Sequence, residues 1–63
     1  MNLANLRNKR LEFNLTQKKV AEYLGISDKH YSSMERGTRS ISLVKANMLA
    51  ELFNTTIEKL FIE

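Results

Sequence analysis

Apolar residues recur at intervals of three and four along almost the whole chain, and short polar segments interrupt the pattern four times. This spacing places apolar side chains on one face of a helix, so it predicts short amphipathic helices. The predicted core positions, helix by helix, are Leu3 and Leu6; Val20 and Leu24; Tyr31 and Met34; Ala46, Leu49, Ala50 and Phe53; and Ile57, Leu60 and Phe61. We interpret them as core rather than as a ligand pocket.

Residues typical of helix ends alternate along the chain. Asn and Gly tolerate the left-handed conformation that ends many helices, and Ser or Thr side chains cap the helix that follows. The possible stops are Asn14, Gly25, Gly37 and Asn54, and the possible caps that follow them are Thr16, Ser27, Ser42 and Thr56. Five helices are therefore predicted, at residues 2–13, 17–24, 28–36, 43–53 and 57–62.

The composition favours an all-α fold in a single domain over residues 1–63. Proline is absent and glycine occurs only twice, so few positions break a helix. No cysteine is present to form a disulfide or bind a metal, so stability must come from helix packing or oligomerisation. No apolar run approaches the roughly 20 residues that cross a bilayer. We expect a cytoplasmic protein without membrane contact, and no ligand-sensing domain beyond Glu63.

Positive charge is concentrated in the first part of the chain. Residues 1–45 hold nine Lys or Arg against four Asp or Glu, whereas residues 46–63 hold one Lys against three Glu. A basic part beside a mildly acidic part indicates a surface that faces a polyanion. An ordinary solvated surface would give the same charges, so both interpretations stand.

The segment TQKKVAEYLGISDKHYSSMERG, residues 16–37, is predicted to form two helices joined by the tight turn at residues 25–27. A short turn that begins with glycine lets two helices cross steeply, as in a helix-turn-helix motif, here at about residues 17–36. We expect Ala21 to lie at the crossing and Ile26 to fill the space beneath the turn.

The outer face of the predicted helix 28–36 carries no apolar residue. Its members are Asp28, Lys29, Ser32, Ser33 and Arg36. Short hydroxyls and long donors of this kind can enter the major groove of DNA and hydrogen-bond to base edges. A solvated helix face has the same composition, so this pattern alone decides neither.

The combined pattern LTQKKVAEYLGIS and, downstream, MERGTR resembles the phage repressor and Cro family, the XRE-type helix-turn-helix proteins. The resemblance covers nearly the whole chain. It implies a compact five-helix, lambda-repressor-like domain and a sequence-specific transcriptional regulator, a repressor or Cro-like protein, that binds a double-stranded DNA operator. It leaves open the operator, the choice between repressor and activator, and a source in a phage, a mobile element or a bacterial chromosome.

The family's DNA contacts carry over to matching positions of this chain. The third helix would read bases through Asp28, Lys29, Ser32 and Ser33, although Asp28 could instead be an acidic first-turn residue that the helix dipole favours. Phosphate contacts would come from Gln17, Lys18, Arg36, Thr38, Arg39 and Ser40, with Lys45 adding charge at the margin.

The resemblance also implies a partly buried ion pair between Arg10 and Glu35, which we assign to structure. Asn14 stands where the family usually has glycine, and Asn accepts the left-handed conformation better than most residues. Tyr31 stands where an aliphatic residue is more common, so its hydroxyl must reach solvent, a partner or a phosphate.

A single recognition helix reads only a few base pairs, so two copies are expected on half-sites about one helical turn apart. Homodimerisation is therefore predicted, at least on DNA. Family members often pair through the last helix and the loop before it, here Thr55, Ile57, Phe61 and Ile62. Alternatively, Ile57 and Phe61 simply complete the core.

The sequence offers little support for catalysis. The single histidine, His30, has no nearby second ligand, so we expect no metal, no cofactor and no enzyme, with His30 exposed or close to a phosphate. The alternative function is a protein-interaction adaptor that uses the acidic C-terminal end of the same scaffold, and a regulatory protein partner is possible. A sequence-blind nucleic-acid binder is a third option. Salt dependence separates the DNA binders from the adaptor.

Overall fold

The computed structural model describes residues 3–62, and this part of the chain is helical with no strand. The elements are α1 (Leu3–Glu12), α2 (Gln17–Leu24), α3 (Asp28–Arg36), α4 (Leu43–Leu52) and η1 (Glu58–Ile62). The bounds of α2 and α3 are those predicted, and α1 and α4 each end one residue early. The predicted start of the first helix at residue 2 lies outside the described residues. The all-α, five-helix prediction is confirmed.

Local side-chain chemistry sets the helix ends as the sequence predicted. The four cap hydroxyls, of Thr16, Ser27, Ser42 and Thr56, each accept a hydrogen bond of 3.0 to 3.2 Å from the backbone N–H three residues on. The four stops have positive φ, which is 57° at Asn14, 75° at Gly25, 82° at Gly37 and 52° at Asn54. Both sets of predictions are confirmed.

The last element differs from the predicted α-helix because η1 is a turn of π-helix. The hydrogen bonds of a π-helix span five residues, so successive side chains lie closer in angle than in an α-helix. The neighbours Leu60 and Phe61 can therefore both face the core, and they are 1% and 2% exposed. Packing against the other helices decides this geometry.

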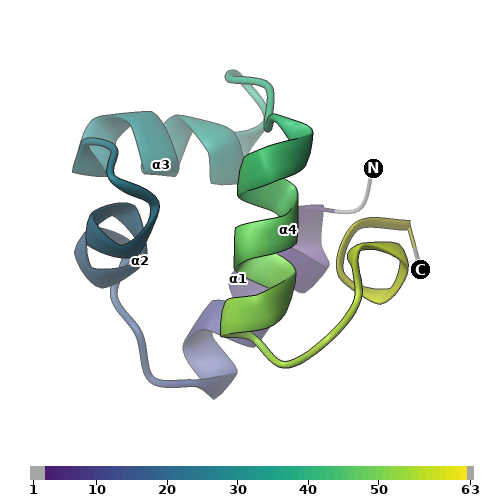
Figure 1. Ribbon diagram of the computed structural model, residues 1–63. Helices are drawn as coiled ribbons and strands as arrows, with labels where there is room; N and C mark the ends of the chain where they lie inside the picture. Colours follow the sequence, from purple (N-terminus) through teal and green to yellow (C-terminus); the bar gives the residue numbers. More distant parts are fainter. Residues whose placement is uncertain (1–2, 63) are drawn as a thin grey trace.

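The helices enclose a core between α4 and its neighbours. In Figure 1, α2 and α3 lie on one side of α4 and η1 lies on the other, with α1 behind. Close contacts join α2 to α3 and to α4, and α1 to α3 and to η1. The loop between α3 and α4 projects at the end of the molecule where these two helices meet (Figure 1). None of the described helices is long and apolar enough to cross a membrane.

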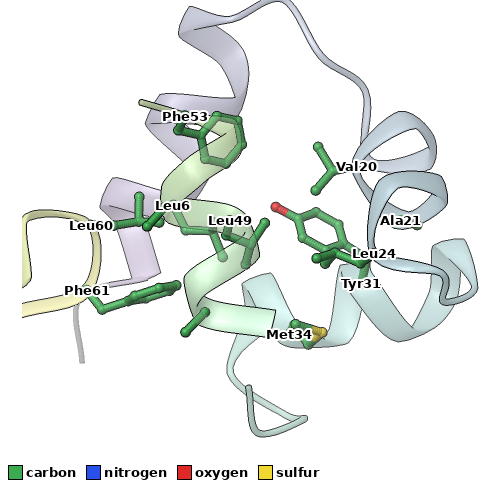
Figure 2. Close-up of a cluster of buried hydrophobic side chains, with 12 residues drawn as sticks. Leu6, Val20, Ala21, Leu24, Tyr31, Met34, Leu49, Phe53, Leu60 and Phe61 are labelled. Carbon is green, nitrogen blue, oxygen red and sulfur yellow. The ribbon is translucent and has the colours of Figure 1, made fainter. Parts of the chain in front are cut away.

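The core contains almost all of the side chains predicted for it. Figure 2 shows the ring of Tyr31 between α2 and α4, with Phe53, Leu49 and Leu6 toward α1. Of the predicted core positions, only Leu3 and Ile57 are partly exposed, and Ile57 still packs against the buried cluster. Ala21 is fully buried in α2 and Ile26 packs on the core below the turn, as predicted.

Candidate nucleic-acid interface

A buried ion pair holds α3 against α1. The Nε of Arg10 donates to Oε2 of Glu35 at 2.7 Å, and its Nη2 donates to Oε1 at 3.3 Å. The two side chains are 9% and 4% exposed. The third nitrogen of Arg10, Nη1, donates to the carbonyl of Leu15 at 3.0 Å, which also fixes the loop before α2. The structure therefore brings together the two residues predicted to pair.

Gln17, predicted from the resemblance to contact a phosphate, also joins this network. Its Nε2 donates to Oε1 of Glu35 at 3.1 Å and so ties the start of α2 to the end of α3. Burial alone would raise the pKa of Glu35, but the hydrogen bonds from Arg10, the nearby hydroxyl of Tyr31, the hydrogen bond from Gln17 and the charge of Arg10 hold it below its usual value. Sequence reasoning missed this bond, and no local signal points to it. The amide of Gln17 keeps a second N–H for a ligand.

The side chain of Tyr31 lies beside the ion pair of Arg10 and Glu35. Its side chain is fully buried, and its hydroxyl makes no hydrogen bond of acceptable geometry with the described residues. Burial and interaction with the Glu35 carboxylate raise the pKa of Tyr31 well above its usual value. Solvent and phosphate, two of the expected destinations of the hydroxyl, are out of its reach because α2 and α4 cover the ring (Figure 2).

An open cleft of about 650 Å³ lies where α2 and α3 begin, and its wall includes Gln17, Lys18 and Asp28. The structure thus places two predicted phosphate contacts beside one predicted base contact. The first three backbone N–H groups of α2 have no partner within the helix, and the Thr16 hydroxyl satisfies only that of Lys19. Such a helix start attracts anionic oxygen atoms.

The outer face of α3 is polar and accessible. Asp28 and Lys29 are exposed, whereas Ser32 and Ser33 are half-buried. The guanidinium of Arg36 lies back along the helix, with Nη1 donating to Ser32 Oγ at 2.9 Å and Nη2 donating to Ser33 Oγ at 3.2 Å. The structure therefore groups Arg36, predicted to contact a phosphate, with two predicted base contacts.

The loop after α3 holds the remaining predicted phosphate contacts. Thr38 Oγ1 donates to the carbonyl of Ser33 at 3.2 Å, which fixes the start of the loop. Arg39 and Ser40 are exposed and line a small pocket of about 250 Å³ together with His30, Ser42 and Lys45. His30 is thus half-buried among basic side chains, a setting that its position in the sequence did not reveal.

Comparison with known protein families shows to which family this chain belongs. The model of the helix-turn-helix family matches residues 6–60 of the chain. The chain belongs to this family. The resemblance to XRE-type helix-turn-helix proteins is therefore confirmed.

Two curated relatives of this helix-turn-helix chain carry regulator names. It is 40% identical over 60 residues to the HTH-type transcriptional regulator AnsR of Bacillus subtilis, a match that covers 95% of this chain and 52% of AnsR. It is 36% identical over 53 residues to an uncharacterized HTH-type transcriptional regulator of Archaeoglobus fulgidus, covering 84% of this chain and 75% of that protein. The chain thus spans about half the length of AnsR. No solved structure matches it significantly.

The four residues predicted for a dimer interface occupy different settings in this helix-turn-helix domain. Phe61 is 2% exposed and belongs to the core, as the alternative interpretation held, and Ile57 is partly buried against it. Thr55 is half-buried, whereas Ile62 is 71% exposed. Sequence reasoning did not single out Leu43, which is also 71% exposed and lines an apolar groove with Ile62.

Within residues 3–62, no group of three or more His, Cys, Asp or Glu side chains is placed to hold a metal ion.

Proposed function

We propose that this helix-turn-helix domain is the sequence-specific, double-stranded-DNA-binding part of a transcriptional regulator. The observation that carries the proposal is the exposed polar face of α3, which lies between two groups of polar and basic side chains that we propose as phosphate contacts. Gln17 and Lys18 stand on one side, in the cleft at the start of α2, and Arg39 and Lys45 stand on the other. A helix in the major groove needs this arrangement, because the backbone contacts fix its position while its own side chains meet the bases.

The proposed base contacts are Asp28, Lys29, Ser32 and Ser33. Lysine pairs best with guanine, aspartate accepts from the amino group of cytosine, and serine suits either kind of edge. The proposed phosphate contacts are Gln17, Lys18, Arg36, Thr38, Arg39 and Ser40. The bond from Gln17 to Glu35 supports its role, since it fixes the amide while leaving one N–H for the DNA.

The relatives' names support regulation of transcription as the purpose of this binding. We further propose a repressor or Cro-like output, since a domain seated in the major groove excludes other proteins from the same site. Action in the cytoplasm of a prokaryotic cell, without an enzymatic step, fits a domain that works by occupying DNA.

Binding by two copies forms part of the proposal. Two half-sites about one helical turn apart would double the number of base pairs that are read. Of the predicted interface residues, Ile62 offers the largest exposed apolar surface, and Leu43 extends it across the groove. Replacement Ile62→Glu should therefore weaken cooperative binding to a two-half-site duplex and leave binding to one half-site unchanged, as measured by gel shift.

The test of the function is selection of binders from a randomised duplex pool at about 0.15 M salt. A partly palindromic site bound about 10³-fold more tightly than scrambled DNA is the expected result. Lys29→Ala, Asp28→Ala and Ser33→Ala should each relax sequence preference, whereas Arg39→Ala should weaken binding to all sequences alike. Lys59→Ala is the matched control, because Lys59 is exposed, lies beside α1 and lines neither of the two clefts that hold the proposed phosphate contacts.

Either of two negative results would change the conclusion. Binding that falls steeply with salt but enriches no sequence indicates a sequence-blind binder. Absence of DNA binding at low salt refutes the proposal and directs attention to the adaptor function and the C-terminal face.

A further inference from the structure

A small pocket with several positive side chains lies between α3, the following loop and the start of α4. His30 comes from α3, Arg39 and Ser40 from the loop, and Ser42 and Lys45 from the start of α4. Its volume is about 250 Å³. Of the described residues that line it, none carries a carboxylate. The pocket therefore presents cations and hydroxyls with no internal counter-charge.

The donors of this pocket suit a tetrahedral anion, because they combine positive charge with several N–H and O–H groups. Lys and Arg side chains supply charge-assisted hydrogen bonds, and serine hydroxyls add neutral ones. The first N–H groups of α4, a helix of ten residues, have no partner inside the helix. The Ser42 hydroxyl accepts a hydrogen bond from only one of them, that of Lys45. The dipole of α4 adds a further positive contribution at this end.

His30 differs from its neighbours because its charge can change near neutral pH. Partial burial, followed by the charges of Arg39 and Lys45, lowers its pKa from the usual value. Elsewhere on its own helix, Asp28 lines the separate cleft beside Gln17, and no residue of α1 or α2 lines this pocket. At neutral pH the imidazole in the DNA-free protein is therefore mostly uncharged.

We propose that the pocket of His30, Arg39 and Lys45 binds one DNA backbone phosphate, and that His30 takes up a proton from solvent when it does so. This inference rests on the proposed DNA-binding function and adds pH control to it. The phosphate carries one negative charge, which partly offsets the charges of Arg39 and Lys45 that disfavour the imidazolium, and one of its oxygens accepts a hydrogen bond from the new N–H.

Coupling between proton and phosphate binding gives DNA affinity a direction with pH. A proton that is taken up on binding is a reactant in the binding equilibrium. A higher proton concentration therefore favours the complex, and DNA binding becomes tighter as the pH falls. A proton affinity of His30 that is about three- to tenfold higher in the complex makes DNA binding tighter by the same factor per subunit once the pH lies below both pKa values of the imidazole. Arg39 and Lys45 stay charged throughout this range, so the effect belongs to His30 alone.

The first test measures binding of the 63-residue chain to a mixed-sequence duplex of about 20 base pairs, two helical turns, at about pH 8 and about pH 5.5. The wild-type protein should bind about three- to tenfold more tightly at the lower pH. His30→Gln should lose this dependence, and His30→Lys should bind alike at both pH values.

A direct readout does not depend on any variant. His30 is the only histidine in the chain, so its imidazole resonances can be followed by NMR without overlap. Its pKa should be higher in the duplex complex than in the DNA-free protein. Glu51→Gln is the control for acid effects, because it removes an exposed carboxylate of α4 that does not line the pocket, and it should keep the full pH dependence.

Different outcomes separate this inference from the function on which it rests. Salt-sensitive DNA binding with the same pH dependence in wild type and His30→Gln, or with an unchanged His30 titration on binding, refutes proton uptake and leaves DNA binding intact. If Glu51→Gln instead abolishes the pH dependence, the effect does not arise at His30 and the inference is wrong. Absence of duplex binding at both pH values refutes the proposed function and this inference together.

Discussion

Replacing Arg10 with methionine is the sharpest test of how the fold supports the interface. Arg10→Met removes the two hydrogen bonds to Glu35 and the bond to the Leu15 carbonyl. Methionine has a similar length and can fill the space, so the change isolates the loss of charge and hydrogen bonding. Glu35, 4% exposed, is left with Gln17 as its one remaining hydrogen-bond partner among those with good geometry.

The expected cost is large relative to the stability of so small a domain. Breaking one partner of a buried ion pair costs about 3 to 5 kcal/mol, because it leaves a buried charge uncompensated. At about 0.05 to 0.15 kcal/mol per residue, the whole chain has about 3 to 9 kcal/mol of folding free energy. The variant should therefore lose at least about a third of this free energy, and at the lower end of the range it should be largely unfolded before any DNA contact is affected.

Urea denaturation followed by circular dichroism measures this cost, with Lys9→Met as the matched control. Lys9 precedes Arg10 in α1 and pairs with Glu12 at 3.7 Å, but the two side chains are 36% and 63% exposed. An exposed pair of this kind contributes about 0 to 1 kcal/mol. The double variant Arg10→Met, Glu35→Met should recover most of the lost stability, because apolar residues of similar volume often replace a buried pair without loss.

The pH dependence of the same variant provides an internal check. In the wild type Arg10 lowers the pKa of Glu35, whereas burial alone would raise it. Without Arg10 the carboxyl therefore takes up a proton at a higher pH. The deficit of Arg10→Met against wild type should therefore shrink as the pH falls from neutral toward 4. A deficit below about 1 kcal/mol at neutral pH would show that the pair is not the buried, coupled unit described above.

Three further outcomes are expected from the remaining structural features. Tyr31→Phe should change the free energy of unfolding by less than about 1 kcal/mol or raise it, because the hydroxyl makes no hydrogen bond of good geometry. A larger loss in thermal denaturation would show that its interaction with Glu35 stabilises the fold. Gly37→Ala should lower the free energy of unfolding more than Gly25→Ala in the same assay. Both glycines have positive φ, but only at Gly37 would a Cβ lie 3.1 Å from the Leu3 side chain. Equal losses would mean that the Leu3 side chain moves aside freely. Wild-type stability should be full above about pH 4.5 and decrease as the pH falls through the lowered pKa of Glu35, as urea denaturation across this range would show; a flat profile would mean that Glu35 is not held ionised by the fold.

Much of the fold could be predicted from the sequence because helix ends are local. The hydroxyl of Ser27 and the left-handed backbone at Gly25 act within a few residues, so the bounds of α2 and α3 were predicted correctly. The apolar spacing then selected the buried face of each helix. The base and phosphate contacts come from resemblance to a family, and they stay predictions until DNA binding is measured.

The rest depends on how the helices cross, which no local pattern encodes. Gln17 and Glu35 are 18 positions apart, and only the crossing of α2 with α3 brings the amide to the carboxylate. The π-helical geometry of η1 follows from burying the adjacent Leu60 and Phe61 against the other helices.

The sequence by itself determined where each helix begins and ends, and which face it buries, because capping and apolar spacing act over a few residues. Only the tertiary structure decided which polar groups meet. It buried the Tyr31 hydroxyl beside the ion pair and put His30 among Arg39 and Lys45, because three elements converge there. Arg39 and Lys45 are far from His30 along the chain, and they lower its pKa only because packing brings their charges within several ångströms of the imidazole.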